Sequence, residues 1–239
     1  MKTLDITLQT PEQNLALDEA LLDLCEAGSG HEILRFWEPL ETFVVLGYSN
    51  KTRLEINELS CKADGLAVLR RASGGGTVLQ GPGCFNYSLF LDLQNRPELA
   101  GITSSNAFIM EKNRAALGSI LSRPVQVQGH TDLTFGNLKF SGNAQRRKKN
   151  YLLFHGTFLY DFDLKRIEKY LALPEDRPAY RADRPHRDFV TNIPVKPAQL
   201  SEALQKTWGC EGTLEEIPME KVNALVEEKY SKDDWNLKY

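Results

Sequence analysis

Three adjacent glycines, Gly74 to Gly76, constrain this chain more than any other feature of its sequence. Glycine loses more backbone entropy on folding than any other residue, so a triple glycine indicates positive φ angles or a ligand held against bare amides. Arg70 and Arg71 stand just before the run and would add bidentate donors for a phosphate or carboxylate. The run is neither a GxxxxGK(S/T) phosphate loop nor a Rossmann GxGxxG, because no lysine follows at that spacing and no helix begins there. Taken alone, it also fits a flexible hairpin tip with solvated arginines.

Strands and helices are expected on both sides of this glycine run. Thr10, Pro11 and Gln13 form a capping-box pattern that predicts a helix ending at Gly28. Runs rich in branched and aromatic residues predict strands at 32–37, 42–46, 66–69, 77–79 and 85–93.

The second half of the chain continues the mixed pattern. A helix is expected at 105–121, and strands at 124–128, 132–135, 138–145 and 152–160, with Gly136-Asn137 closing a hairpin between the second and third of these. Further helices are expected at 163–171, 198–208 and 219–229, the first two separated by a loop rich in proline and arginine at 173–197. No repeat or linker divides the chain, so residues 1–239 predict one α+β domain with a mixed β-sheet flanked by helices.

Charge and cysteine usage exclude several classes of protein. Twenty-nine basic residues oppose 32 acidic ones, so the chain lacks the basic field of a non-specific nucleic-acid binder. Its apolar runs are far shorter than a membrane span, and no signal-peptide pattern opens the chain. The cysteines and histidines show no CxxC or metal-ligand spacing, so we expect no metal site and a cytoplasmic location without nucleic-acid or membrane partners.

Several motifs together carry a family resemblance. Arg-Arg-x-Ser-Gly-Gly-Gly-Thr-Val at 70–78, continuing to Gly-Cys-Phe-Asn at 83–86, resembles the signature of lipoate–protein ligases, in the biotin/lipoate ligase superfamily. The stretches at 14–21, 131–133, 139–144, 154–157 and 234–236 are similar to other motifs of that family, in the same order. The resemblance covers nearly the whole chain, and it implies a single ligase-like catalytic domain.

The resemblance implies a two-step reaction. Lipoate and ATP, supplied as its Mg²⁺ complex, would form lipoyl-adenylate, and the acyl group would pass to a lysine of a lipoyl carrier domain of the 2-oxoacid dehydrogenase E2 or glycine cleavage H type. Lys139 would be the catalytic residue, because a fixed ammonium can neutralise the charge that develops on the α-phosphate. The residues expected to bind substrate or adenylate are Arg70, Arg71, Ser73, Gly74, Gly75, Gly76, Thr77, Val78, Gly83, Asn86, Thr131, Asp132 and Ala144.

The sequence also departs from the family pattern. Gln80 stands where many members have histidine, and Thr131 where ligases usually have asparagine; both can still hydrogen-bond. Larger bacterial ligases carry a carboxy-terminal accessory domain, whereas this chain stops near Trp235-Asn236. We therefore expect either a short form or dependence on a separately encoded accessory subunit.

Two alternative functions stay open from the sequence. A carrier-to-carrier octanoyl or lipoyl transferase would need a thiol near the lysine motif, and Cys84 is the one cysteine within a motif. Cys84 fits a small packed residue, but a thiolate beside Arg70 or Lys139 would have a lowered pKa and could act as a nucleophile.

A non-catalytic carrier-binding module is the second alternative. The basic run at 146–149 could dock an acidic partner, or could be a solvated hairpin end. The arginines of 181–186 fit either a lid over the adenylate or a surface loop.

Overall fold

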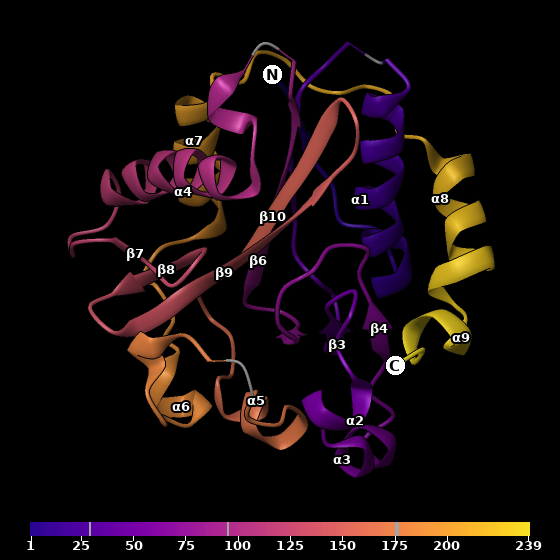
Figure 1. The fold of residues 1–239 in the computed structure, drawn as a ribbon, viewed down its shortest axis with the longest axis vertical. Coiled ribbons are helices and arrows are strands. Elements are labelled where there is room, and N and C mark those ends of the chain that lie inside the picture. Colours follow the sequence, from indigo (N-terminus) through magenta and orange to yellow (C-terminus); the bar gives the residue numbers. More distant parts are fainter. Residues whose placement is uncertain (29, 95, 175–176) are drawn as a thin grey trace.

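The computed structural model describes residues 1–28, 30–94, 96–174 and 177–239 (Figure 1). Within these residues the larger sheet has seven strands in the order β1 (Lys2–Asp5), β2 (Ile33–Trp37), β6 (Cys84–Asp92), β10 (Tyr151–Leu159), β9 (Leu138–Arg147), β8 (Asp132–Phe135) and β7 (Gln126–Gln128). β1 and β2 pair in parallel, and every other neighbouring pair in this sheet is antiparallel. The expected mixed sheet flanked by helices is confirmed.

A smaller sheet carries the glycine run. Its strands lie in the order β4 (Val68–Arg70), β3 (Phe43–Leu46) and β5 (Val78–Gln80), so the glycines form the connection between its two outer strands. Beside it lie the short helices α2 (Thr52–Glu55), α3 (Glu58–Ala63) and α5 (Lys165–Tyr170). Apolar side chains of α3 and α5 pack against this sheet in a cluster of their own.

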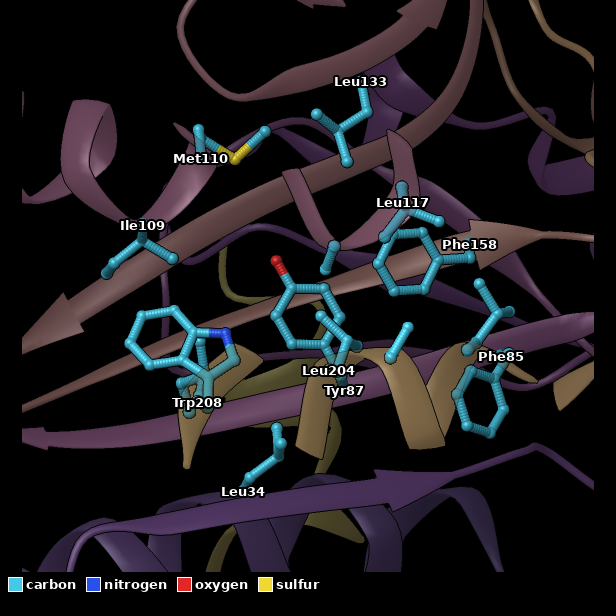
Figure 2. Packing of buried hydrophobic residues seen from close by; sticks show 14 of the residues in the cluster. Leu34, Phe85, Tyr87, Ile109, Met110, Leu117, Leu133, Phe158, Leu204 and Trp208 are labelled. Atoms are coloured by element: carbon cyan, nitrogen blue, oxygen red, sulfur yellow. The ribbon is translucent and has the colours of Figure 1, made fainter. Parts of the chain in front are cut away.

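Helices cover both faces of the larger sheet. α4 (Ile102–Gly118) and α7 (Pro197–Trp208) pack on one face, and α1 (Pro11–Glu26) and α8 (Met219–Leu225) on the other (Figure 1). Strand alternation supplies both cores, since Leu34 and Phe36 of β2 join the first cluster while Ile33 and Trp37 join the second. Figure 2 shows Tyr87 in the middle of the first cluster, its ring among apolar side chains.

Local sequence signals place most elements correctly. α1 begins after Thr10 with the expected capping box, and Gly136 takes the positive φ of 54° that its hairpin turn requires. The expected last helix is partly wrong, because α8 ends at Leu225 and continues as a π-helical turn, η3 (Val226–Tyr230).

Short elements escaped the sequence patterns. They are β1, α2, α3, the 3₁₀ turns η1 (Pro97–Leu99) and η2 (Ala179–Arg181), α6 (His186–Phe189) and α9 (Asp233–Asn236). Each has six residues or fewer, too short for a hydrophobic period to show. Two of them, η2 and α6, lie inside the expected loop 173–197, of which residues 175–176 fall outside the described residues.

The basic run at 146–149 is not a solvated hairpin end. Arg146 and Arg147 belong to β9, where Arg146 contacts Glu19 and Arg147 donates to the carbonyl of Leu99. Lys148 pairs with Asp23 on α1, which leaves Lys149 as the exposed member. The run therefore ties the end of a hairpin to neighbouring elements, and its docking of an acidic partner stays a prediction.

Among the described residues, no helix is long and apolar enough to cross a membrane.

Candidate functional site

A cavity of about 920 Å³ lies between the glycine run, strands β9 and β10, and the segment that follows residue 176. Most of the expected site residues line it. They are Arg71, Gly75, Gly76, Thr77, Val78, Asn86, Thr131, Asp132, Lys139 and Ala144. The structure thus brings the glycine run and the lysine motif to one site, which their spacing in the sequence could not establish.

Gly75 gives the glycine run its shape. It has a φ of +86°, and a Cβ there would lie 2.9 Å from Arg71 Nη2 and 3.3 Å from Ala144 Cβ. Gly47 makes room from the other side, since a Cβ on Gly47 would lie 2.0 Å from the Gly75 carbonyl oxygen. The backbone therefore has to be bare at both positions for β9 and residue 47 to approach the run.

Both arginines before the run hold backbone carbonyls. Arg71 Nη2 donates to the carbonyl oxygens of Gly74 at 2.6 Å and Gly76 at 2.8 Å, and burial lowers the Arg71 pKa to about 10. Arg70 is fully buried and donates to the carbonyl oxygens of Gly47 at 2.7 Å and Asn50 at 2.9 Å. Arg70 does not line the cavity, and its hydrogen bonds fix the loops around the site. Its contact with the adenylate stays a prediction.

Ser73, Gly74 and Gly83 also lie outside the cavity lining. Gly74 is exposed, and the structure places no heavy atom of the described residues within 4 Å of a Cβ built there. Gly83 has a φ of +91°, and a Cβ on it would lie 2.4 Å from the Asp161 backbone, so its glycine serves a tight turn.

Ser73 belongs to a hydrogen-bond chain that reaches the cavity wall at His155. Its Oγ lies 2.6 Å from His155 Nε2, and His155 Nδ1 lies 3.1 Å from Asp18 Oδ2. Asp18 also pairs with the buried Arg35 at 2.6 Å. Burial opposes ionisation of Asp18, but the Arg35 charge and the His155 and Ser88 contacts outweigh it and lower the Asp18 pKa.

Lys139 stands between two elements at the cavity wall. Its Nζ lies 2.8 Å from Asp132 Oδ1, and the hydroxyl of Tyr180 donates to Asp132 Oδ2 at 2.6 Å. A Cβ on Gly142 would lie 2.9 Å from both Lys139 Cε and Nζ, so this glycine leaves the space that the ammonium occupies. Asp132 thus positions Lys139 on one side and anchors the later segment on the other.

Asn86 is held in a closed triangle of side chains. Its Nδ2 donates to Gln80 Oε1 at 3.1 Å, Gln80 Nε2 donates to Thr157 Oγ1 at 2.7 Å, and Thr157 Oγ1 donates to Asn86 Oδ1 at 2.5 Å. Gln80, which departs from the family pattern, therefore fixes the amide of a cavity residue.

Thr131, the second departure, is fixed from the far side of the sheet. Thr131 Oγ1 donates to the Asn143 carbonyl at 2.6 Å, and Tyr87 donates to the Asn143 side chain at 2.6 Å. Asn113 of α4 donates to Tyr87 in turn, and Trp208 of α7 donates to Asn113. This chain of hydrogen bonds therefore connects α4 and α7 to the wall of the cavity.

None of the four cysteines, all of which lie in the described part of the chain, lines the cavity. Cys84 is fully buried in the apolar cluster of the smaller sheet, and burial raises its pKa well above the usual value for a thiol. A nucleophilic role for Cys84 is therefore not supported, because the reactive form of a thiol is the accessible thiolate.

Sequence reasoning missed several residues of the cavity wall, among them Trp37 and Asn50. Asn50 follows a turn and accepts a hydrogen bond from the Gly47 amide, which is a local signal that could have been found. For the arginines of 181–186 the sequence left a lid and a surface loop open; in the structure Arg181 lines the cavity.

No group of three or more His, Cys, Asp or Glu side chains within the described ranges could hold a metal ion. The described carboxylates of the cavity wall are Glu55 and Asp132.

Residues 10–207 match the family model described as the lipoyl protein ligase A/B catalytic domain. Two curated relatives span nearly all of this chain. The "Probable lipoate-protein ligase A" of Mycoplasma pneumoniae is 27% identical, and the match covers 99% of this chain and 71% of that protein. The octanoyltransferase LipM of Lysinibacillus sphaericus is 27% identical, with 96% of this chain and 95% of that protein covered.

Solved structures share the fold. A lipoate-protein ligase A bound with ATP has a TM-score of 0.83 at 24% identity, covering 99% of each chain. A bi-partite lipoate protein ligase of Thermoplasma acidophilum, studied with its E2 lipoyl domain, has a TM-score of 0.81 at 24% identity, covering 99% of this chain and 96% of that one.

Proposed function

This chain belongs to the lipoyl protein ligase A/B catalytic-domain family, and from that premise we propose that it is an ATP-dependent lipoate–protein ligase. In the first step a carboxylate oxygen of lipoate attacks the α-phosphorus of ATP. The bond from that phosphorus to the oxygen bridging to the β-phosphate breaks, and pyrophosphate leaves with the electron pair. In the second step the amine of a carrier lysine attacks the acyl carbon, AMP leaves, and the amine loses a proton.

The observation that carries this proposal is the make-up of the cavity. Residues of the glycine run and Lys139 line the same cavity. All of the chain's cysteines are described, and none of them lines it. A thiol acyltransferase needs a thiolate at the site, whereas adenylate formation needs fixed positive charge near the reacting phosphorus. The composition of this wall favours the adenylate route.

Lys139 is the residue we assign to that charge. Asp132 holds its ammonium at 2.8 Å, so the cation is positioned before substrate arrives. It therefore needs no reorganisation free energy at the moment of reaction. The ammonium can offset the repulsion between a carboxylate and a phosphate, and the extra negative charge as the new bond forms.

An apolar end of the cavity suits the acyl chain. Leu15, Trp37, Val45 and Val78 line the cavity and pack together in one apolar cluster. Such a surface fits an aliphatic tail with a dithiolane ring, and it leaves the carboxylate to face the polar wall.

We propose that Mg²⁺ enters with ATP as part of the substrate. Mg²⁺ in nucleotide sites is bound by substrate phosphates with one or two protein carboxylates, and the described carboxylates of the cavity wall are Glu55 and Asp132. The residues present therefore fit a metal that arrives with the nucleotide.

The acyl acceptor we propose is a lysine of a lipoyl carrier domain, of the E2 or glycine cleavage H type. The Thermoplasma acidophilum relative was studied with an E2 lipoyl domain and is described as bi-partite. We therefore also propose that a separately encoded accessory subunit can take part.

A carrier-to-carrier octanoyl transferase is the second candidate, because LipM of Lysinibacillus sphaericus matches this chain over nearly the full length of both. The two functions differ in the acyl donor. A ligase should modify a lipoyl domain with free lipoate only when ATP is present, as followed by intact mass of the domain. Modification from octanoyl-carrier without ATP, through an enzyme adduct that hydroxylamine removes, would overturn the ligase proposal.

A further inference from the structure

Arg181 is a buried guanidinium that the local structure leaves incompletely bonded. The residue is 4% exposed and lines the cavity, and its Nη2 has no hydrogen-bond partner within the described residues. Its Nε donates to the Arg184 carbonyl at 3.2 Å, and its guanidinium lies over the Phe189 ring at 4.6 Å. A buried charged donor without a partner is costly, so it indicates a ligand that completes the site.

The neighbouring Arg184 shows what a structural arginine looks like in this segment. Its three donor nitrogens reach the carbonyl oxygens of Arg181 at 3.0 Å, Tyr180 at 2.8 Å and Asp188 at 3.1 Å. Arg184 does not line the cavity. The segment therefore uses one arginine to hold its own backbone and keeps another for the cavity.

Among the described residues, Arg181 forms no ion pair with a carboxylate. Asp132 raises the Arg181 pKa through its charge, but its two oxygens are taken by Lys139 at 2.8 Å and Tyr180 at 2.6 Å. Arg177 also lines the cavity, and its partner Asp183 points to solvent with a side chain 98% exposed. Burial and then the Arg177 charge lower the Arg181 pKa.

The backbone fixes the segment that carries Arg181 to the strand that carries Lys139. The amide of Thr191 donates to the Lys139 carbonyl at 2.8 Å, and Val190 bridges to Lys139, so the segment is fixed to β9 at that residue. Ala182, directly after Arg181, has a φ of 51°, the one positive φ at a non-glycine position in the described chain. Strain of this kind persists where the surrounding structure demands a particular side-chain position.

We propose that Arg181, supported by Arg177, binds the β- and γ-phosphates of the nucleotide and then the pyrophosphate that leaves. This inference rests on the proposed adenylate-forming function and assigns a site within it. Lys139, held by Asp132, serves the reacting α-phosphorus, and Arg181 presents a planar donor fork of the kind that suits phosphate oxygens. Binding there stabilises the leaving group as the bond between the α-phosphorus and the bridging oxygen breaks.

The test compares three variants, Arg181→Met, Arg181→Lys and Arg187→Met. Arg187 is the matched control, since it lies in the same segment, is 69% exposed in its side chain and does not line the cavity. Calorimetry with inorganic pyrophosphate and Mg²⁺ should show binding weakened about ten- to a hundredfold in Arg181→Met, because a charged hydrogen-bond donor is lost. Arg181→Lys should lose less, and Arg187→Met should match wild type.

A second measurement separates the two half-reactions. Transfer of the lipoyl group from preformed lipoyl-adenylate to a carrier domain should stay within about twofold of wild type in Arg181→Met, because pyrophosphate has already left. Wild-type affinity for pyrophosphate in both Arg181 variants would overturn the assignment, and so would an equal loss in both half-reactions. If Arg181→Met does not fold, Arg181→Lys decides by the same two readouts. Arg181-dependent pyrophosphate binding without any lipoate-dependent reaction of ATP would instead reject the proposed function and keep the anion site.

Discussion

The segment at 70–77, which contains the glycine run, and the segment at 177–190 form different walls of one cavity. Both segments are rich in arginine. In the segment at 70–77, Arg70 and Arg71 donate hydrogen bonds to backbone carbonyl oxygens, so the loop is fixed before any ligand binds. On the other side, Arg184 does the same, but Arg181 keeps a buried donor without a described partner. The arginine content of a segment therefore does not distinguish a ligand-binding arginine from a structural one, whereas the hydrogen bonds of each guanidinium do.

Arg70→Met tests the fixed side of this comparison and should have the largest effect. Loss of the guanidinium leaves the carbonyls of Gly47 and Asn50 buried without their donor, together with its contacts to Trp235 and Asn236. We expect the free energy of unfolding to fall by about 3–5 kcal/mol, since a buried charged network is broken. Urea unfolding measures this, with the exposed Arg53→Met as control. A loss of activity at unchanged stability would mean that Arg70 acts on substrate instead.

Lys139→Ala tests the point where the two walls meet. We expect lipoyl-adenylate formation in a single turnover to slow by at least about a hundredfold, because the positioned charge at the reacting phosphorus is lost. Folding should change little, because Asp132 keeps its hydrogen bond from Tyr180 when the lysine is removed. Lys149→Ala, an exposed lysine of the neighbouring hairpin, should behave as wild type. Equal rates in the two variants would reject the role of Lys139.

Gly75→Val and Gly74→Val compare neighbouring glycines of one run. Valine at 75 meets Arg71 and Ala144 and resists the φ of +86°, whereas valine at 74 meets open space. We expect a non-hydrolysable adenylate analogue to bind at least about tenfold more weakly to Gly75→Val, and near wild-type strength to Gly74→Val. Calorimetry gives both values, and tight binding by Gly75→Val would show that the loop does not shape the ligand site.

Gly142→Ala should have the smallest effect of the four. The added methyl group displaces the Lys139 ammonium without removing its charge, because the Cβ would lie 2.9 Å from Nζ. A flexible lysine stem can partly compensate, so we expect adenylate formation to slow by about tenfold at most. Gly118→Ala, where the described structure offers open space for the Cβ, is the control. Equal rates in the two alanine variants would mean that the exact place of the ammonium does not matter.

The sequence predicted the long elements of the fold because their hydrophobic periods and caps are local. The capping box of α1 and the Gly136 turn are examples, whereas β1 and α2 are four residues each and carry no period of their own. At the site, Gly75 could be recognised from the cost of glycine alone. The roles of Arg70, Tyr180 and Arg181 could not, because each depends on partners that approach from distant parts of the chain.

Exchange of radiolabelled pyrophosphate into ATP, on the protein without any carrier, tests the central claim most directly. Adenylate formation is reversible and releases pyrophosphate, so a lipoate ligase should incorporate label into ATP only when lipoate is present. We predict lipoate-dependent exchange for the wild type, and its loss by at least about a hundredfold in Lys139→Ala. Absence of exchange in wild-type protein that still moves octanoyl groups between carriers without ATP would contradict the account.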